Sequence, residues 1–158
     1  MNGRIYTVTF SAVNISAIQD LFELTPADDK PIEIVGLELG QTSDSGDAQD
    51  EQLQISISRG NTSSGSGGSS PTPQPINAND TAAGFTAKAN TSTTQASGGT
   101  RVLLWTSAWN VRAGYINWFP EGLRPAASQG STIMRVELPV APADQITVSG
   151  TVWVRELY

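Results

Sequence analysis

The chain of 158 residues contains no cysteine and no histidine. Without cysteine, neither a disulfide framework nor thiolate chemistry is available. Without histidine, the chain lacks the commonest general base and the commonest transition-metal ligand. A catalytic triad that uses histidine and a zinc site ligated by histidine are therefore excluded.

Long apolar runs are also missing from the chain. The residues that follow Met1 do not form an apolar run of signal-peptide length, so we expect a protein made in the cytoplasm and not secreted. No stretch approaches the roughly 20 apolar residues that a membrane span needs. The sequence therefore predicts no contact with a membrane.

Charged residues make up only 15% of the chain, and the net charge is −6. The acids gather in residues 20–51, where Lys30 is the single base, whereas residues 52–158 carry slightly more bases than acids. Nucleic-acid binding requires a basic surface that displaces phosphate counterions, so this balance argues against it. The two regions could meet across a subunit contact, or the acids could simply form a solvated face.

Residues 52–59 alternate strictly between polar and apolar side chains, which is the period of a strand with one buried face. A run of Gly, Ser, Thr and Pro follows, and between residues 61 and 100 only Ile76 and Phe85 are large and apolar. Such a segment has little to bury and a high cost of ordering. We predict a long loop or arm over residues 60–100, with residues 61–75 mobile until they meet a partner.

Similar alternation, separated by turn signals, recurs along the whole chain. The predicted strands cover residues 5–12, 18–24, 32–39, 52–59, 101–111, 115–119, 132–138 and 146–154. A change of parity beside Gly36 suggests a β-bulge, and residues 76–89 could hold an edge strand or a short turn of helix. The sequence thus predicts an all-β chain in which residues 1–158 form a single-domain, jelly-roll-like β-sandwich of eight to nine strands.

No group of residues stands out as a reaction centre. The acidic loop at residues 41–51 has the oxygen ligands that calcium needs, but its spacing does not match an EF-hand, and it is also ordinary solvated turn chemistry. Carboxylates on strands, such as Glu23 and Glu137, do not form a recognisable pair for glycoside hydrolysis. We therefore predict no catalytic residue, no cofactor and no metal site.

An aromatic stretch spans residues 105–119 and is flanked by arginines. Three interpretations are open: the rings fill the core, they anchor a protein interface, or they stack on sugars. The candidate partner-binding residues are Trp105, Trp109, Tyr115, Trp118, Arg112 and Arg124.

Several short motifs are spread over nearly the whole chain. They are Leu21-Phe22-Glu23-Leu24, Pro26-Ala27-Asp28-Asp29-Lys30-Pro31, Gly40-Gln41-Thr42-Ser43-Asp44-Ser45-Gly46-Asp47, Ile57-Ser58-Arg59-Gly60 with the Gly/Ser run, Ala82-Ala83-Gly84-Phe85, Phe119-Pro120-Glu121, Pro142-Ala143-Asp144 and Ser149-Gly150-Thr151. In these motifs the chain resembles small β-sandwich virion proteins of tailed bacteriophages. The resemblance implies a non-enzymatic structural virion protein of the capsid decoration (cement) type. It would bind the major capsid protein on the outer surface of a phage head.

Two further expectations concern assembly and the alternative role. A trimer suits the threefold positions of a capsid, so we expect a homo-oligomer, with a trimer first and a dimer second. The alternative function is a carbohydrate- or receptor-binding module of a phage fibre, which the aromatic stretch would serve.

Overall fold

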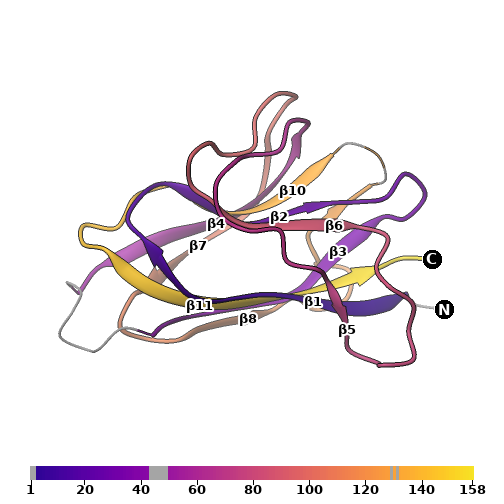
Figure 1. The fold of residues 1–158 in the computed structure, drawn as a ribbon, viewed down its shortest axis with the longest axis horizontal. Coiled ribbons are helices and arrows are strands. Elements are labelled where there is room, and N and C mark those ends of the chain that lie inside the picture. Colours follow the sequence, from indigo (N-terminus) through magenta and orange to yellow (C-terminus); the bar gives the residue numbers. More distant parts are fainter. Residues whose placement is uncertain (1–2, 43–49, 129, 131) are drawn as a thin grey trace.

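The computed structural model describes residues 3–42, 50–128, 130 and 132–158. In this part of the chain every regular element is a β-strand, so no helix is present that could cross a membrane. The strands are β1 (Arg4–Ile15), β2 (Gln19–Thr25), β3 (Ile32–Gln41), β4 (Gln52–Asn61), β5 (Gln74–Pro75), β6 (Thr86–Thr91), β7 (Val102–Asn110), β8 (Tyr115–Trp118), β9 (Ala126–Ala127), β10 (Ile133–Leu138) and β11 (Ile146–Glu156). They form two antiparallel sheets packed as a sandwich (Figure 1), which confirms the predicted all-β sandwich.

The two sheets draw their strands from all parts of the chain. Sheet A has the order β5-β1-β11-β3-β8, with β9 also paired to β3, and sheet B has the order β6-β2-β10-β4-β7. The central strand of sheet A is β11 and the central strand of sheet B is β10. The first and last strands lie side by side, with Arg4 opposite Glu156, so the described ends of the chain meet at one end of the sandwich (Figure 1).

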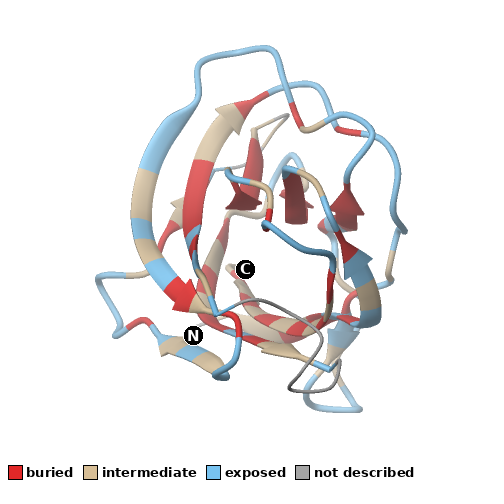
Figure 2. Cartoon of the chain, turned by 90° about the vertical axis from the view of Figure 1, so that its left-hand side faces the viewer, coloured by how far each residue is buried: buried red, intermediate tan, exposed pale blue. Residues whose placement is uncertain are grey.

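The core lies between the two sheets and follows the alternation of the strands. Along β11 every second residue is buried, which is the signature of a strand with one face on the core (Figure 2). Ile55, Ile57, Val148 and Val152, which the alternation places on the apolar face of their strands, are all fully buried. The predicted phase of these two strands is therefore confirmed.

The register of β3 contains the predicted bulge. Trp153 of β11 lies opposite Gly36, but Val154 lies opposite Ile34, so Val35 is an extra residue on β3. One extra residue changes which of the following side chains face the core. The parity change read from the sequence is therefore confirmed as a bulge.

The described residues form eleven strands, more than the eight to nine predicted. All eight predicted ranges are strands, but the chain also forms β6 and the two-residue strands β5 and β9 among the described residues. The edge-strand alternative for residues 76–89 is realised in part, because β6 pairs with β2 over Thr86–Thr91. A two-residue strand offers too short a pattern to be recognised by alternation.

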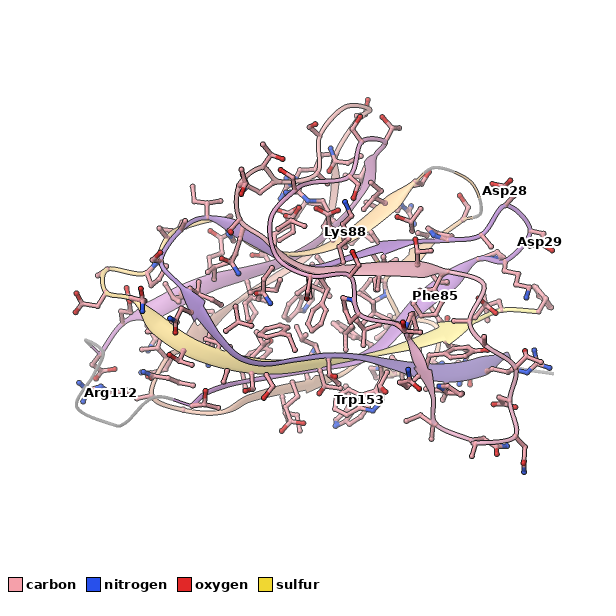
Figure 3. The ribbon with its side chains drawn as sticks, in the orientation of Figure 1. Asp28, Asp29, Phe85, Lys88, Arg112 and Trp153 are labelled. Carbon is pink, nitrogen blue, oxygen red and sulfur yellow. The ribbon has the colours of Figure 1, made fainter. Side chains whose placement is uncertain are left out.

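Residues 60–100, predicted as a long loop or arm, fold back onto the sandwich, with β6 paired to β2 of sheet B and β5 paired to β1 of sheet A. Their two flanks lie together as a paired lobe (Figure 1), held by backbone bonds such as Ser63 N–H to Ser97 O (2.9 Å) and Ser66 N–H to Thr94 O (2.9 Å). Further along, Phe85 inserts into the core, edge-on to Tyr6 at 5.7 Å between ring centroids (Figure 3). We call residues 62–100 the covering segment.

Strand β10 is buried along its whole length. One face lies on the core, and the other carries Arg135 and Glu137, which bind Asp20, Asn61 and Arg101. A strand that reads as one-sided in the sequence is therefore enclosed on both faces.

Candidate functional site

The aromatic stretch divides among three environments. Trp109 is only 1% exposed and donates its indole N–H to Ala113 O (2.9 Å). It therefore belongs to the core and is removed from the candidate partner-binding residues. Trp105 packs at the edge of the core against Phe119 (5.5 Å, edge-on) and Tyr115 (6.3 Å). Burial raises the pKa of Tyr115, and its hydrogen bond with Ser107 partly opposes that rise.

Trp118 occupies the third environment, on the outer face of sheet A. It pairs with Gly36 in the β3–β8 register, and a Cβ at Gly36 would collide with its ring. Its ring therefore lies flat over the glycine and contacts Trp153 at 4.6 Å between centroids, and Figure 3 shows Trp153 pointing away from the core. Trp118 remains 52% exposed. This pair forms an exposed aromatic surface on the outer face of sheet A.

The two candidate arginines also lie in different settings. Arg124 donates to Glu33 Oε1 (2.7 Å) and to Phe119 O (3.2 Å), so it fixes the loop after β8 to β3. Arg112 is exposed in the turn after β7, where its backbone N–H donates to Asn110 Oδ1 (2.9 Å). The structure thus does not gather the six candidates into one cluster.

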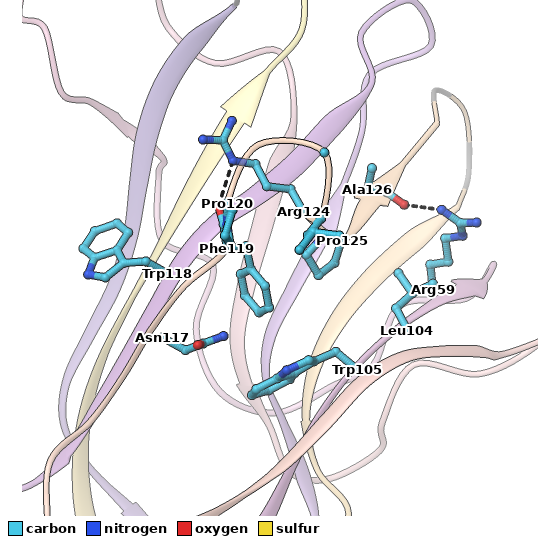
Figure 4. Close-up of a pocket in the computed structure, with 12 residues that line it drawn as sticks. Arg59, Leu104, Trp105, Asn117, Trp118, Phe119, Pro120, Arg124, Pro125 and Ala126 are labelled. Carbon is cyan, nitrogen blue, oxygen red and sulfur yellow. Dashed lines mark hydrogen bonds between the residues drawn. The ribbon is translucent and has the colours of Figure 1, made fainter.

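A cavity of about 480 Å³ opens between the sheet edges at β7 and β8. Figure 4 shows the side chains of Trp105, Phe119 and Pro125 around it, with Arg59 at one end, while the Trp118 ring points away. Arg59 donates to Ala126 O. Sequence analysis missed Arg59, because an arginine at the end of an alternating strand carries no signal of a pocket.

Apolar side chains are exposed on the two strands and the loop beside this cavity. They are Val102 and Leu103 on β7, Ile116 on β8, and Leu123, which lines the cavity and is 73% exposed. A register shift between Ile57 and Ser58 leaves Leu104 as an extra residue on β7, next to Val102 and Leu103. We call the cavity and these residues the open edge.

A second cluster, made of charged groups, lies beneath the covering segment. Arg135 donates two bonds to Asp20 Oδ1 (2.9 and 2.6 Å), and Ala96 N–H donates to Asp20 Oδ2 (2.8 Å). Gly65 N–H donates to Glu23 (3.1 Å), as does the Ser64 hydroxyl (2.7 Å). Buried carboxylates therefore bind the backbone of the covering segment to sheet B.

Burial and hydrogen bonding act in opposite directions on the two acids of β2. Burial raises the pKa of Asp20 to about 7, and the neighbouring Glu23 adds to the rise, while Arg135 opposes it. Burial also raises the pKa of Glu23, but hydrogen bonds from Asp20, Thr91, Ser64 and Gly65 outweigh that effect and hold it below its usual value. The pKa values of the two acids are therefore moved apart, with that of Asp20 raised and that of Glu23 lowered.

Glu137 extends the cluster on β10. Arg101 donates to both of its oxygens (2.9 Å for the ion pair) and Ser58 donates to Oε1. Burial raises the pKa of Glu137, yet these bonds and the arginine charges hold it below its usual value. Sequence analysis weighed Glu23 and Glu137 only as an enzyme pair, and no local pattern revealed that they would be covered.

The acidic region is partly neutralised within the chain. Asp20 pairs with Arg135 at 2.6 Å, and Glu33 pairs with Arg124 at 2.7 Å and Arg155 at 3.3 Å. These pairs reduce the opposite charge that we expected two copies to share. The calcium interpretation falls mostly on residues 43–49, which lie outside the described residues; within the described part no cluster of three potential metal ligands occurs.

Comparison with known proteins finds no matching family model and no matching curated protein. Among solved structures, the chain is similar to a T=1 particle derived from infectious bursal virus, at 18% identity and a TM-score of 0.25 over 98% of this chain. It is also similar to the T13 particle of that virus (15% identity, TM-score 0.23, 100% of this chain) and to a VP2 subviral particle (17%, 0.23, 98%). The chain spans only 40%, 40% and 42% of the length of the protein chains in these three structures. TM-scores this low do not establish a shared fold.

Proposed function

We propose that this chain is a non-enzymatic structural virion protein, a capsid decoration (cement) protein that binds the major capsid protein on the outside of a tailed-phage head. The observation that carries the proposal is the open edge, where apolar side chains on β7, β8 and the following loop are exposed beside one cavity. Contiguous exposed apolar surface on a soluble domain marks a site of interaction. The motif resemblance to phage virion β-sandwich proteins supplies the context.

We propose further that the connectivity is that of a jelly roll. Without β5, β6 and β9, the sheet orders β1-β11-β3-β8 and β2-β10-β4-β7 support this, because eight strands divided in this alternating way correspond to two Greek keys. A rigid sandwich suits a cement role, since its loops and edges are presented at fixed positions.

Repetition on a capsid lets individually weak contacts add, because binding at one site raises the effective concentration at the next. A homo-oligomer, a trimer first and a dimer second, would strengthen that effect. Sedimentation at 0.05 M and 0.5 M salt tests the contact: association that weakens with salt indicates charge pairing, whereas indifference to salt indicates apolar burial. A monomer at every concentration would contradict the oligomer and leave capsid binding unaffected.

The decisive experiment is co-sedimentation of the purified chain with heads of its phage that lack it, followed by electron microscopy. We expect saturable binding to the outer surface, reduced at least about tenfold by Leu103→Ser combined with Leu123→Ser, since apolar anchors dominate interfaces. Ile76→Ser is the matched control, because Ile76 is equally apolar and exposed but lies near β5. Heads that bind none of the chain would overturn the proposal.

The second candidate, a carbohydrate-binding module, is favoured by one observation. The half-exposed Trp118 lies flat over Gly36 beside Trp153, and a flat indole is a surface on which a sugar ring can stack. Titration of tryptophan fluorescence with oligosaccharides tests it. A saturable change that Trp118→Ala abolishes would favour this role over the cement role.

A further inference from the structure

The outer edge of β7 is free to accept another strand. Among the described residues β7 pairs with β4 alone. Val111 N–H donates to Glu51 O (3.2 Å), and no register shift separates Val111 from Trp105. Because the direction of N–H groups alternates along an antiparallel strand, those of Thr106, Ala108 and Asn110 face away from β4.

This edge lacks the usual protection against strand pairing. Edge strands are normally short, or carry lysine, proline or inward-facing charge. Residues 102–110 contain no charged residue and no proline, and Thr106 and Ala108 are exposed. The register shift at Leu104 is the one irregularity in the pairing of β7 with β4, and it lies near the start of β7. A ladder can therefore form along most of β7.

The cavity beside β7 specifies which side chains an added strand would bring. It holds about 480 Å³ and is lined mainly by apolar groups such as Leu104, Trp105 and Phe119. Its charged lining residues are Arg59 and Arg124, with no acid among them. Arg124 already pairs with Glu33, whereas no described carboxylate lies within ion-pair distance of Arg59. In the adjoining loop, Glu121 lies near Arg155 instead.

We propose that the open edge binds an extended acidic segment of a partner protein, which adds a strand to β7. An apolar side chain of that segment fills the cavity, and a neighbouring Asp or Glu pairs with Arg59. Main-chain bonds supply affinity in this mode of recognition, and the pocket supplies specificity. The inference rests on the proposed function in one respect only, that the segment would belong to the capsid shell.

The test uses blocked ten-residue peptides of Thr, Ser and Val with a central Leu-Glu pair. Matched peptides replace Glu by Gln or by Lys, and another carries N-methyl groups on alternate backbone nitrogens. Binding to the full chain is followed by amide NMR of Thr106, Ala108 and Asn110. We expect the Leu-Glu peptide to bind about tenfold more tightly than the Leu-Gln peptide, a difference of about 1.4 kcal/mol, since a hydrogen bond to a charged group is stronger than one between neutral groups.

Two variants, each with a matched control, separate the contribution of the β7 backbone from that of Arg59. Ala108→Pro removes an outward N–H and should abolish binding, while Ala108→Ser should preserve it. Arg59→Gln should erase the preference for Glu over Gln, while Arg4→Gln, in an exposed pair with Asp80, should leave it intact. Circular dichroism of each variant checks that the fold is retained.

Other outcomes would overturn the proposal. Equal binding of the Glu and Lys peptides, full binding of the N-methylated peptide, or no binding at millimolar peptide would each do so. Self-association that Ala108→Pro abolishes would make a second copy the occupant instead. Binding of oligogalacturonate that Ala108→Pro leaves unchanged would assign the cavity to an acidic sugar. Because no capsid is used, these results are independent of the co-sedimentation experiment.

Discussion

The covered face of sheet B and the open edge reverse the usual arrangement of polar and apolar groups. Beneath the covering segment, Asp20, Glu23 and Arg135 are buried and hydrogen bonded. At the open edge, Leu103 and Leu123 face solvent. Both regions belong to the same sandwich, and the difference between them lies in what covers each.

The comparison shows two ways to complete a sheet surface. A segment rich in Gly and Ser cannot stabilise itself by apolar burial, so it is held through its backbone amides by carboxylates. The open edge has exposed apolar side chains and an outer strand edge that no other described strand pairs with. The covering segment binds the outer face of sheet B within the chain, and we infer that a partner protein binds the open edge.

The largest expected effect comes from removing the cation of the covered face. Arg135→Met leaves buried carboxylates without their partner, and should cost about 3–5 kcal/mol of unfolding free energy at pH 8. Arg4→Met, which breaks an exposed pair with Asp80, should cost about 0–1 kcal/mol. Urea denaturation measures both. Equal costs would mean that the covered charges contribute no more than a surface pair.

Apolar residues should show the converse difference between core and open edge. Ile55→Ala should cost about 2–5 kcal/mol, since it leaves a cavity between the sheets. Leu123→Ala, at a residue 73% exposed, should change stability by no more than about 0.5 kcal/mol. Urea denaturation would contradict this reading if Leu123→Ala destabilised the chain as strongly as Ile55→Ala.

The pH dependence of stability should report on Asp20. Its folded-state pKa is about 7, above the ordinary 3.8, so its contribution is complete below about pH 3.8 and is lost as the pH rises towards 7. Glu23 and Glu137 have lowered pKa values, so their contribution is present above their ordinary 4.5 and is lost as the pH falls. Each pKa unit corresponds to about 1.4 kcal/mol.

We therefore expect the unfolding free energy to be highest near pH 5 and to decline towards pH 8. Asp20→Asn should remove most of the decline above pH 5 and leave the loss below pH 4. Asp80→Asn is the control and should retain both limbs. A wild-type chain that gains stability from pH 5 to 8 would show that Asp20 is ionised throughout.

The smallest of these effects concerns the backbone of the covering segment. A Cβ at Gly65 would collide with Thr94 O and with the Glu23 carboxylate, so Gly65→Ala should cost about 1–3 kcal/mol. Limited proteolysis should then cleave residues 62–75 faster. At Gly114 a Cβ meets nothing within 4 Å, so Gly114→Ala should leave cleavage unchanged. Unaltered cleavage in Gly65→Ala would mean that the segment is held elsewhere.

The sequence predicts the sandwich because polar and apolar side chains alternate along its strands, and the apolar side chains of every strand pack into the same core. Ile55, Ile57, Val148 and Val152 follow this rule, and the parity change beside Gly36 located the bulge correctly. Phe85, one of two large apolar residues in the covering segment, became its anchor in the core. Local pattern is sufficient wherever a residue's environment depends on its own strand.

The candidate site was predicted less well, because its environment depends on distant segments. Arg135 and Glu137 alternate with apolar neighbours and look like a solvated face, but partners distant in the sequence, Asp20, Asn61 and Arg101, bind them where they are buried. Trp109 shares its parity with Val111, which is the pattern of a core residue. Trp118 lies outside because Gly36 on another strand leaves room for its ring.

The positions of β10 and β11 also constrain how the chain can fold. These are the last two strands in the sequence, yet each is the middle strand of its sheet. Until residues 133–156 have left a ribosome, β1 and β2 have no neighbours through which to reach β3 and β4. Contacts between strands far apart in the sequence fold slowly. Neither sheet can therefore close before β10 and β11 are in place between its halves.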